Sequence, residues 1–260
     1  MTPLQTPDLS IVLFACDHVP TFHGCVHAAR RARGLAESAG FSVQSLVVMH
    51  AQQARVASWC SDNLDASWEI LTSGETIGSA LRNAAAGAAR GRYLAWADGT
   101  DLWSANWLLA GLRGVISEGG IWHPEMLLTY SGDHFSTEGM TFRLFSEADG
   151  EVEALLSADT LPTGFLCERE LMESFPFPEE DAARGLGEVE RWWHCNIASA
   201  GQRHRIMPAT FHYRRRFWHE LAKGETHWRM RERMGSITWP ADPSPARRAA
   251  GATATSAASA

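Results

Sequence analysis

The sequence predicts an α/β fold, with a mostly parallel sheet flanked by helices in a single domain, and three observations favour it. Short apolar runs alternate with stretches of helical pattern in the first half of the chain. Asp or His follows several of these runs, at the positions where parallel sheets gather ligands. The chain has 260 residues, 45% of them hydrophobic, which is enough for one large core.

The elements can be placed in order along the chain. The run SIVLFA predicts a strand at residues 10–15, and the Ala- and Arg-rich stretch after it predicts a helix at 24–37. Further strands are expected at 42–49, 69–71 and 93–97, and further helices at 77–89, 106–116 and 166–174. Asp17, His50 and Asp98 would then share the carboxyl edge of the sheet.

The second half of the chain has a less regular pattern. Residues 121–145 are typical of mixed strands and loops, and Pro124 favours an edge strand or a rim loop at Trp122–Glu125. Residues 241–260 hold almost no large apolar side chain, so we expect a disordered tail there. With an N-terminal extension at 1–8, the folded domain is expected to span 9–240.

The charge balance and the hydrophobic pattern exclude some classes of protein. Because 30 acidic residues face 23 basic ones, dedicated nucleic-acid binding is not expected. No apolar run is long enough to cross a bilayer and no basic leader is visible, so we expect a cytoplasmic protein without a transmembrane segment. A helix at 221–234 could make peripheral membrane contact, although a solvated charged face is favoured.

The cysteines and histidines predict neither a disulfide framework nor a zinc site. The five cysteines are odd in number, scattered, and never in a C-x-x-C pair, so they are expected to be reduced packing residues. His194, Cys195, His204 and His212 lack the spacing of a structural zinc site, and packed or capping roles are favoured. Among the 11 tryptophans, Trp103 and Trp107 are expected in the core.

Two carboxylates after the strand at 93–97 carry the first functional signal. Asp98 and Asp101 could hold a divalent cation that bridges diphosphate oxygens. The alternative is a plain Asp-Gly turn in which Asp101 caps the next helix. These residues alone favour the turn.

An ordered set of motifs surrounds these carboxylates. It comprises Asp17 after the first strand, Arg82-Asn83 after a Gly-punctuated loop, the G-x-Y-φ-x-φ-x-D-x-x-D stretch at 91–101, PTGFLCERELMESFPFPEE at 162–180 and GLGEVERWWHCNIASAGQRHRIMPATFHYRRR at 185–216. In order and spacing, this set resembles the inverting, family-2-type glycosyltransferases with the GT-A fold, over about residues 9–217.

The resemblance implies a function and a set of site residues. It implies transfer of a sugar from a nucleotide-sugar donor to a carbohydrate or lipid-linked acceptor by single displacement, as in polysaccharide biosynthesis. It also implies that residues 9–103 form a nucleotide-binding half and residues 104–240 an acceptor half. Glu190 would be the general base. The residues expected to contact the donor are Asp17, Arg82, Asn83, Asp98 and Arg214. The residues expected to bind Mg²⁺ or Mn²⁺ are Asp98, Asp101 and His212. The acceptor would stack on Trp192 and Trp193, although these two side chains could also lie in the core.

The sequence departs from that family at acidic positions. Met49 and His50 replace an acidic pair, Thr100 replaces a metal-binding Asp, and Arg191 follows Glu190 where a second acid is expected. A catalytically degenerate protein that binds nucleotide sugar or glycan, or supports a partner enzyme, is therefore the alternative function. A nucleotidyltransferase is disfavoured because no Gly-rich, Lys-containing loop follows the first strand.

A basic cluster could replace the cation. It consists of Arg203, His204, Arg205, His212, Arg214, Arg215 and Arg216. Guanidinium groups neutralise phosphate oxygens through charged hydrogen bonds, so this cluster could bind a diphosphate without a metal. The alternatives are a solvated basic strand and a surface for anionic lipid.

Overall fold

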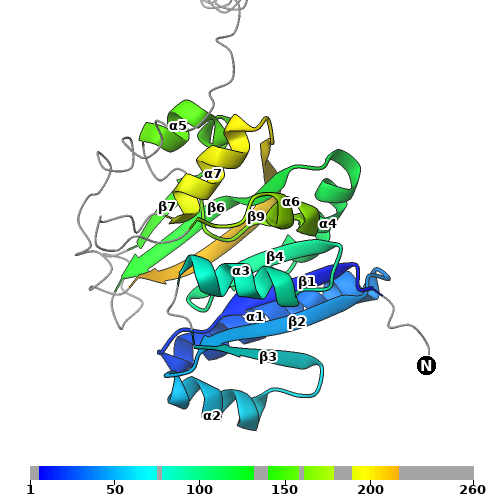
Figure 1. The fold of residues 1–260 in the computed structure, drawn as a ribbon, viewed down its shortest axis with the longest axis vertical. Helices are drawn as coiled ribbons and strands as arrows, with labels where there is room; N and C mark the ends of the chain where they lie inside the picture. The colour runs from blue at the N-terminus through cyan, green and yellow to red at the C-terminus, as the bar shows by residue number, and fades with distance from the viewer. Residues whose placement is uncertain (1–5, 75–77, 132–139, 158–160, 179–188, 217–260) are drawn as a thin grey trace, which may run out of the picture.

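A computed structural model describes residues 6–74, 78–131, 140–157, 161–178 and 189–216 of the chain (Figure 1). Within these residues the strands form one nine-stranded sheet, in the order β3-β2-β1-β4-β8-β6-β9-β5, with β7 paired to β6 beside this path. The expected tail at 241–260 and the expected helix at 221–234 lie outside the described residues. The domain boundaries remain a prediction.

The elements follow one another in an alternating pattern at first and a mixed pattern later. The first are β1 (Leu9–Phe14), α1 (Val19–Ser38), β2 (Val43–His50), α2 (Ala54–Asn63), β3 (Trp68–Ser73), α3 (Ser79–Ala88), β4 (Tyr93–Asp98), β5 (Asp101–Trp103) and α4 (Trp107–Glu118). The later ones are β6 (Ile121–Ser131), β7 (Met140–Leu144), the 3-10 helix η2 (Glu147–Gly150), α5 (Val152–Ser157), β8 (Leu166–Glu168), α6 (Arg169–Ser174), α7 (Val189–Ser199) and β9 (His204–Arg216).

The first four strands form a parallel half-sheet. β1 pairs in parallel with β2 on one side and with β4 on the other, and β2 pairs in parallel with β3. Parallel neighbours need crossover connections, and α1, α2 and α3 supply them. Since the order runs β3-β2-β1 and then continues with β4, the connections switch sides between β1 and β4. The carboxyl ends of these two strands are the place where such sheets form a ligand crevice.

The second half of the sheet mixes strand directions, which the sequence pattern only partly indicated. β8 is antiparallel to β4 and to β6, whereas β6 and β9 run parallel. The expected edge strand or rim loop at Trp122–Glu125 is wrong, because β6 lies between β8 and β9. The register between β6 and β9 shifts between Pro124 and Met126, and this irregularity accommodates a proline inside the sheet.

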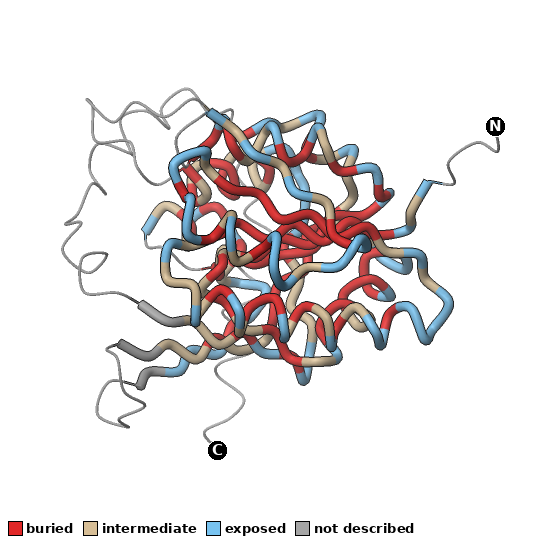
Figure 2. The backbone as a smooth tube through the Cα atoms, turned by 90° about the horizontal axis from the view of Figure 1, so that it is seen from below, coloured by how far each residue is buried: buried red, intermediate tan, exposed pale blue. Residues whose placement is uncertain are grey.

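Two apolar layers cover the two faces of the sheet. Alternate residues of β1 point to opposite faces: Leu9, Ile11 and Leu13 pack with α1 and α4, whereas Val12 and Phe14 pack with α3, α6 and α7. Figure 2 shows the buried residues concentrated in the central strands, with exposed positions on the outer sides of the helices. Trp103 and Trp107 are 6% and 0% exposed, which confirms their predicted place in the core.

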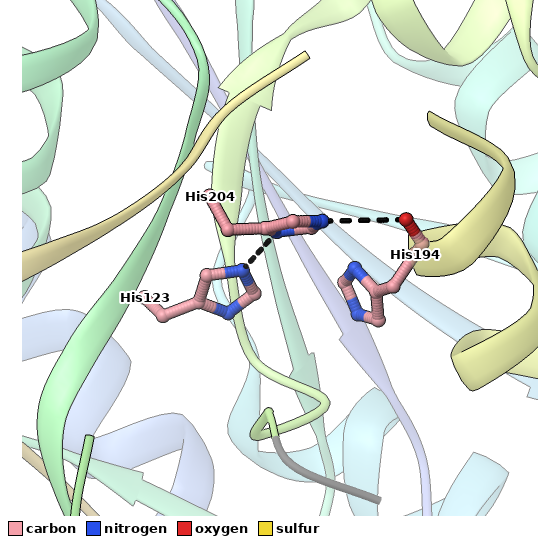
Figure 3. A group of neighbouring side chains, drawn as sticks. All are labelled: His123, His194 and His204. Carbon is pink, nitrogen blue, oxygen red and sulfur yellow. Dashed lines mark hydrogen bonds between the residues drawn. The ribbon is translucent and has the colours of Figure 1, made fainter. Parts of the chain in front are cut away.

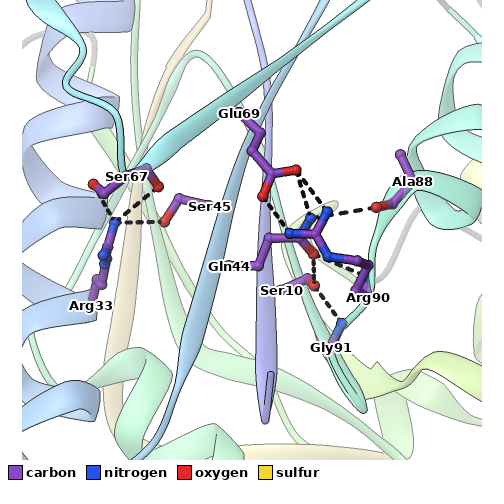
Figure 4. A network of polar contacts seen from close by, with 9 residues as sticks. All are labelled: Ser10, Arg33, Gln44, Ser45, Ser67, Glu69, Ala88, Arg90 and Gly91. Carbon is purple, nitrogen blue, oxygen red and sulfur yellow. Dashed lines mark hydrogen bonds and ion pairs between the residues drawn. The ribbon is translucent and has the colours of Figure 1, made fainter. Parts of the chain in front are cut away.

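Hydrogen bonds and an ion pair connect the amino-terminal ends of the parallel strands (Figure 4). The buried Gln44 side chain accepts a hydrogen bond from Ser10 Oγ at 2.6 Å and donates to Glu69 at 3.1 Å. Arg90 pairs with both carboxylate oxygens of Glu69, at 2.8 and 2.5 Å. The Gly91 amide donates to Ser10 Oγ at 2.8 Å. These contacts satisfy buried polar groups and hold β1, β2, β3 and the start of β4 in register.

Several element boundaries differ from the sequence-based expectation. α1 begins at Val19 rather than Gly24, because proline is tolerated in a first helical turn and the His18 side chain accepts a hydrogen bond from the Thr21 amide. α2 was not predicted. The helix expected at 166–174 is divided into β8 and α6.

Candidate functional site

The carboxyl ends of β1 and β4 form the centre of the candidate site. Asp98 is the last residue of β4 and lies opposite Phe14 of β1. A Cβ atom on the next residue, Gly99, would come within 2.6 Å of the Phe14 carbonyl oxygen, so the chain can pass this close to β1 only as glycine. The turn delivers the Asp98 side chain, 32% exposed, to the edge of the sheet.

Arg82 of α3 links Asp98 to Glu190. Its Nη2 atom lies 3.7 Å from Asp98 Oδ1 and makes a short contact with Oε1 of Glu190, the second residue of α7. Arg82 and Glu190 are separated by 108 positions in the chain. The guanidinium lies over the rings of Phe14 and Phe177, 5.2 and 5.7 Å from their centres. The fold thus brings Asp98 and Glu190 together through one shared cation.

Arg214 forms a second, buried ion pair behind Asp98. β5 and β9 pair so that Asp101 lies opposite Arg214, whose Nε and Nη2 atoms donate to the two Asp101 oxygens at 2.6 and 2.5 Å. Burial disfavours the charge on Arg214, but the charge of Asp101 and its hydrogen bonds outweigh burial and raise the pKa of Arg214 above its usual value. Arg214 also contacts the Thr163 hydroxyl and lies 4.0 Å from Asp98 Oδ2.

A narrow recess lies beside these groups. Its polar lining is Arg82, Asp98, Thr163 and Glu190, set against four aromatic rings and Ala97. Ligand sites are commonly about 300–1,000 Å³, and this recess is much smaller, so it can admit only a small part of a ligand. The sequence pattern did not single out Thr163 as a site residue, although it lies in the 162–180 segment that carried the resemblance.

The donor atoms at this site do not fit a divalent cation. Asp98 is flanked by two guanidinium groups at 3.7 and 4.0 Å, which would repel a cation. Asp101 is 1% exposed and both its oxygens accept hydrogen bonds from Arg214. His212 is 0% exposed, lies between the rings of Trp103 and Trp107, and does not line the recess. The arrangement therefore disagrees with the expected Asp98, Asp101 and His212 set.

Two other residues that the resemblance implied for donor binding lie in different settings. Asp17 is exposed in the loop between β1 and α1. Asn83 donates through its amide nitrogen to the Phe177 carbonyl and accepts from the Phe177 amide, both at 2.8 Å. Asn83 thus holds the backbone that carries one aromatic ring of the recess.

The two tryptophans expected to contact an acceptor have different environments. Trp193 is 0% exposed, stacks between Phe165 and Phe177, and donates from its indole nitrogen to the Phe175 carbonyl at 2.6 Å. A side chain with no exposed face cannot stack on a sugar, so Trp193 belongs to the core. Trp192 is half-buried against Leu155 and Leu161, and its acceptor role stays a prediction.

Two of the substituted acidic positions, Met49 and Arg191, have structural roles here. Arg191 is 3% exposed and donates to the carbonyls of Leu155 and Leu156, each at 2.6 Å, where the last turn of α5 leaves carbonyls unpaired. Met49 is a core residue at 1% exposure. An acid at position 191 would leave these buried carbonyls without a donor.

The basic cluster proposed from sequence is not one cluster. Arg205 pairs with Glu118 at 2.9 Å and with Glu147 at 3.6 Å, and His204 lies in the interior. The side chains of Arg215 and Arg216 lie outside the described set. Of the described members, Arg214 alone borders the candidate site.

Comparison with known proteins finds similarity in structure but not in sequence. No protein-family model and no curated protein matches the chain. The structure of TarS residues 1–349 from S. aureus in complex with UDP matches with a TM-score of 0.54 and 10% identity, over 80% of this chain and 60% of that one. The mannosyltransferase PcManGT from Pyrobaculum calidifontis, in complex with GDP-Man and Mn²⁺, matches with a TM-score of 0.53 and 15% identity, over 81% of this chain and 57% of that one.

The chain has a GT-A-like fold. This confirms the α/β class expected from the sequence. The chain spans about three fifths of the length of these solved structures. Among the residues that the structure describes, no helix has the length and apolar character needed to span a membrane.

Proposed function

We propose that this protein is a glycosyltransferase that transfers a sugar from a nucleoside-diphosphate donor to a carbohydrate or lipid-linked acceptor. The observation that carries the proposal is the meeting of Asp98, Arg82 and Glu190 at the strand ends of β1 and β4. This is the crevice where such sheets bind ligands, and the solved structures with the same fold are complexes with UDP and GDP-Man. The five free thiols favour a reducing, cytoplasmic environment.

The residues divide the reaction between them. Arg82 turns from Glu190 toward the donor's diphosphate, which frees the Glu190 carboxylate for the acceptor. The acceptor hydroxyl oxygen attacks the anomeric carbon, its proton passes to Glu190, and the bond from that carbon to the diphosphate oxygen breaks with its electron pair on the leaving group. Attack from the side opposite the leaving group inverts the anomeric configuration. Asp98, held by Arg214, orients the donor at the same edge.

We propose that this step proceeds without a divalent cation at Asp98. Arg82 supplies positive charge for the leaving diphosphate, and the fixed Arg214 charge lies beside it. Both guanidinium groups occupy space around Asp98 that a cation would need. The proposal thus keeps Asp98 and Arg82 as donor residues and assigns Asp101 and Arg214 to positioning.

Donor binding is tested by thermal shift with uridine, guanosine, thymidine and cytidine diphosphates, each with EDTA and with Mn²⁺. At least one should raise the melting temperature in EDTA, since a ligand at 100 times its Kd stabilises a protein by about 2.7 kcal/mol. Arg82→Gln should abolish the shift, whereas Arg90→Gln, an exposed arginine at the other end of the strands, should retain it. A shift that requires Mn²⁺ contradicts the cation-free step, and no shift with any diphosphate contradicts the donor site.

The base is tested with Glu190→Gln. Turnover of the identified donor should fall by about 10²- to 10⁴-fold while the thermal shift persists, because proton transfer is lost but donor contacts remain. Glu173→Gln, an exposed change on α6, is the matched control and should keep full turnover. Undiminished turnover in Glu190→Gln contradicts the assignment.

A catalytically inactive binding protein is the second candidate. Glu190 contacts Arg82 in the structure, and Arg191 stands where the family's second acid is expected. Wild-type protein that binds a nucleoside diphosphate but neither hydrolyses nor transfers the corresponding nucleotide sugar would support this candidate over the transferase.

A further inference from the structure

Three histidines from separate elements meet in the interior, next to Phe165, whose ring also lines the recess of the candidate site. His123 comes from β6, His194 from α7 and His204 from β9 (Figure 3). Their exposures are 0%, 3% and 4%, and one ring nitrogen from each lies within 4.8 Å of the other two. The sequence analysis predicted no zinc site from the spacing of His194, Cys195, His204 and His212. In the structure, His194 and His204 lie together, and His123 is the third member of the cluster.

The hydrogen bonds of the cluster leave nitrogen lone pairs in its centre. His204 Nε2 lies 3.4 Å from the His194 carbonyl oxygen, which can only accept, so the hydrogen of His204 is on Nε2. His204 Nδ1 therefore carries a lone pair, which accepts a hydrogen bond from His123 Nε2 at 2.9 Å. Within the described part of the chain, neither ring nitrogen of His194 has a hydrogen-bond partner.

Unpartnered, fully buried imidazole nitrogens require an explanation, because a buried polar group without a partner costs about 1–3 kcal/mol. A bound cation would supply the missing partner. Burial lowers the pKa of all three histidines, and their mutual proximity lowers the pKa of His123 and His194 further, which keeps the rings neutral. Neutral imidazole is the form that binds metal.

We propose that His123, His194 and His204 bind a Zn²⁺ ion. Zinc takes histidine nitrogens at about 2.0–2.1 Å, so two nitrogens of one tetrahedral ion lie about 3.3 Å apart, close to the 2.9 Å between His123 Nε2 and His204 Nδ1. The His194 carbonyl holds the His204 ring from behind, as outer-shell partners of zinc-binding histidines do. On binding, the hydrogen of His123 moves from Nε2 to Nδ1, and a water molecule completes the tetrahedron.

The ion would join the elements that frame the candidate site. α7 begins beside Glu190, and β9 continues to Arg214, so a bond from His194 to His204 through zinc fixes these two elements to each other and to β6. η2 packs closely against His204, because a Cβ on Gly150 would come within 2.2 Å of the His204 Cβ. Since the cluster is enclosed, zinc would enter as the chain folds. The inference stands independently of the proposed transferase activity.

The test uses the full chain, refolded from denaturant with and without Zn²⁺ and then dialysed against EDTA. We expect about one retained zinc per chain, a higher melting temperature for the zinc-refolded protein, and an X-ray absorption spectrum with imidazole scattering at about 2.0–2.1 Å. Refolding with Co²⁺ should give the intense visible bands of a four-coordinate ion. Absence of retained metal, or a spectrum without an imidazole shell, overturns the proposal.

Matched variants assign the site. His194→Gln should lower zinc affinity at least about tenfold, whereas His27→Gln, an exposed histidine on α1, should retain zinc, as should Asp98→Asn at the candidate donor site. If His194→Gln keeps its zinc, the proposal is wrong. If that variant does not fold, the absorption and Co²⁺ spectra of the wild-type chain still decide the question.

Discussion

At the scale of single residues, the Asp101–Arg214 pair makes the sharpest stability prediction. The Asp101 side chain is buried and that of Arg214 is 12% exposed, and each is the other's main charge partner. Arg214→Met leaves the Asp101 carboxylate buried without its partner, which should lower the free energy of unfolding by about 3–5 kcal/mol. Urea unfolding at neutral pH measures this loss. Combining Arg214→Met with Asp101→Asn should restore part of it, because no charge then remains buried unpaired.

The exposed Arg143–Asp149 pair is the control for that prediction. The Arg143 side chain is 44% exposed and its pair distance is 3.0 Å. Surface pairs contribute about 0–1 kcal/mol, so Arg143→Met should cost no more than that. Equal losses for Arg143→Met and Arg214→Met would contradict the difference that burial should make.

Residue by residue, the sequence located the acidic centre of the site better than its surroundings. Asp98, Arg82 and Glu190 stand in ordered motifs, and the structure brings all three together, although their roles remain proposals. The histidine cluster gave no such signal, because His123 and His204 are 81 positions apart on strands whose pairing no local pattern specifies. The sequence was misleading at Trp193, which we expected beside Trp192 at the acceptor, because adjacent residues on a helix face different environments.

At the scale of helices, two glycines should respond oppositely to the same substitution. Gly34 lies inside α1, and a Cβ there would meet nothing within 4 Å. Gly114 lies inside α4, and a Cβ there would come within 2.6 Å of Met207 and 2.9 Å of Trp122. Gly34→Ala should stabilise the protein by up to about 1 kcal/mol, because alanine is the better helix former. Gly114→Ala should destabilise it by about 1–3 kcal/mol, through overpacking.

Melting curves of the two variants check this prediction, and helix propensity is matched between them. If Gly114→Ala also stabilises the protein, the close packing of α4 on β6 and β9 is wrong. If Gly34→Ala destabilises it, the open space beside α1 is wrong instead.

Local patterns predicted the elements with a clear apolar pattern and missed α2 and β8. β1, β2 and β4 are mostly apolar and could be placed from sequence, as could α3 and α4. α2 was missed because half of its residues are polar and only Val56 and Cys60, at helical spacing, are buried. β8 has three residues, and its extended shape comes from pairing with β4 and β6 rather than from its own composition.

At the scale of the whole molecule, the alternation of strands and helices along the chain predicts the parallel half of the sheet but does not determine the mixed half. Strand, helix and strand in sequence imply parallel neighbours, and β3-β2-β1-β4 follow that rule. The order β8-β6-β9-β5 depends on pairings between segments distant in the chain, for which the sequence offers no local signal. The candidate site joins both halves, so its complete geometry required the structure.

The reactivity of the cysteines reports on the packing of the whole fold, because all five are free thiols and four of them are buried. Burial raises the pKa of Cys60 to about 11 and of Cys195 to about 12, and raises the pKa of Cys25 well above its usual range. Cys16, only partly buried, also has its pKa raised to about 11, from 9.0. Since the thiolate is the reactive form, a rise of this size reduces it about a hundredfold at pH 8.

We therefore expect native protein at pH 8 to react with a thiol reagent such as Ellman's at least about a hundredfold more slowly than free cysteine, and to release five equivalents once urea unfolds it. The same shifts set the sign of the alkaline response. Unfolded thiols ionise near their usual pKa while the native ones stay protonated, so stability is complete below pH 9 and declines as the pH rises from 9 toward 11. Rapid labelling of native protein at pH 8, or a free energy of unfolding that rises over this alkaline range, would contradict the packing of β1, α1 and α2 around Cys16, Cys25 and Cys60.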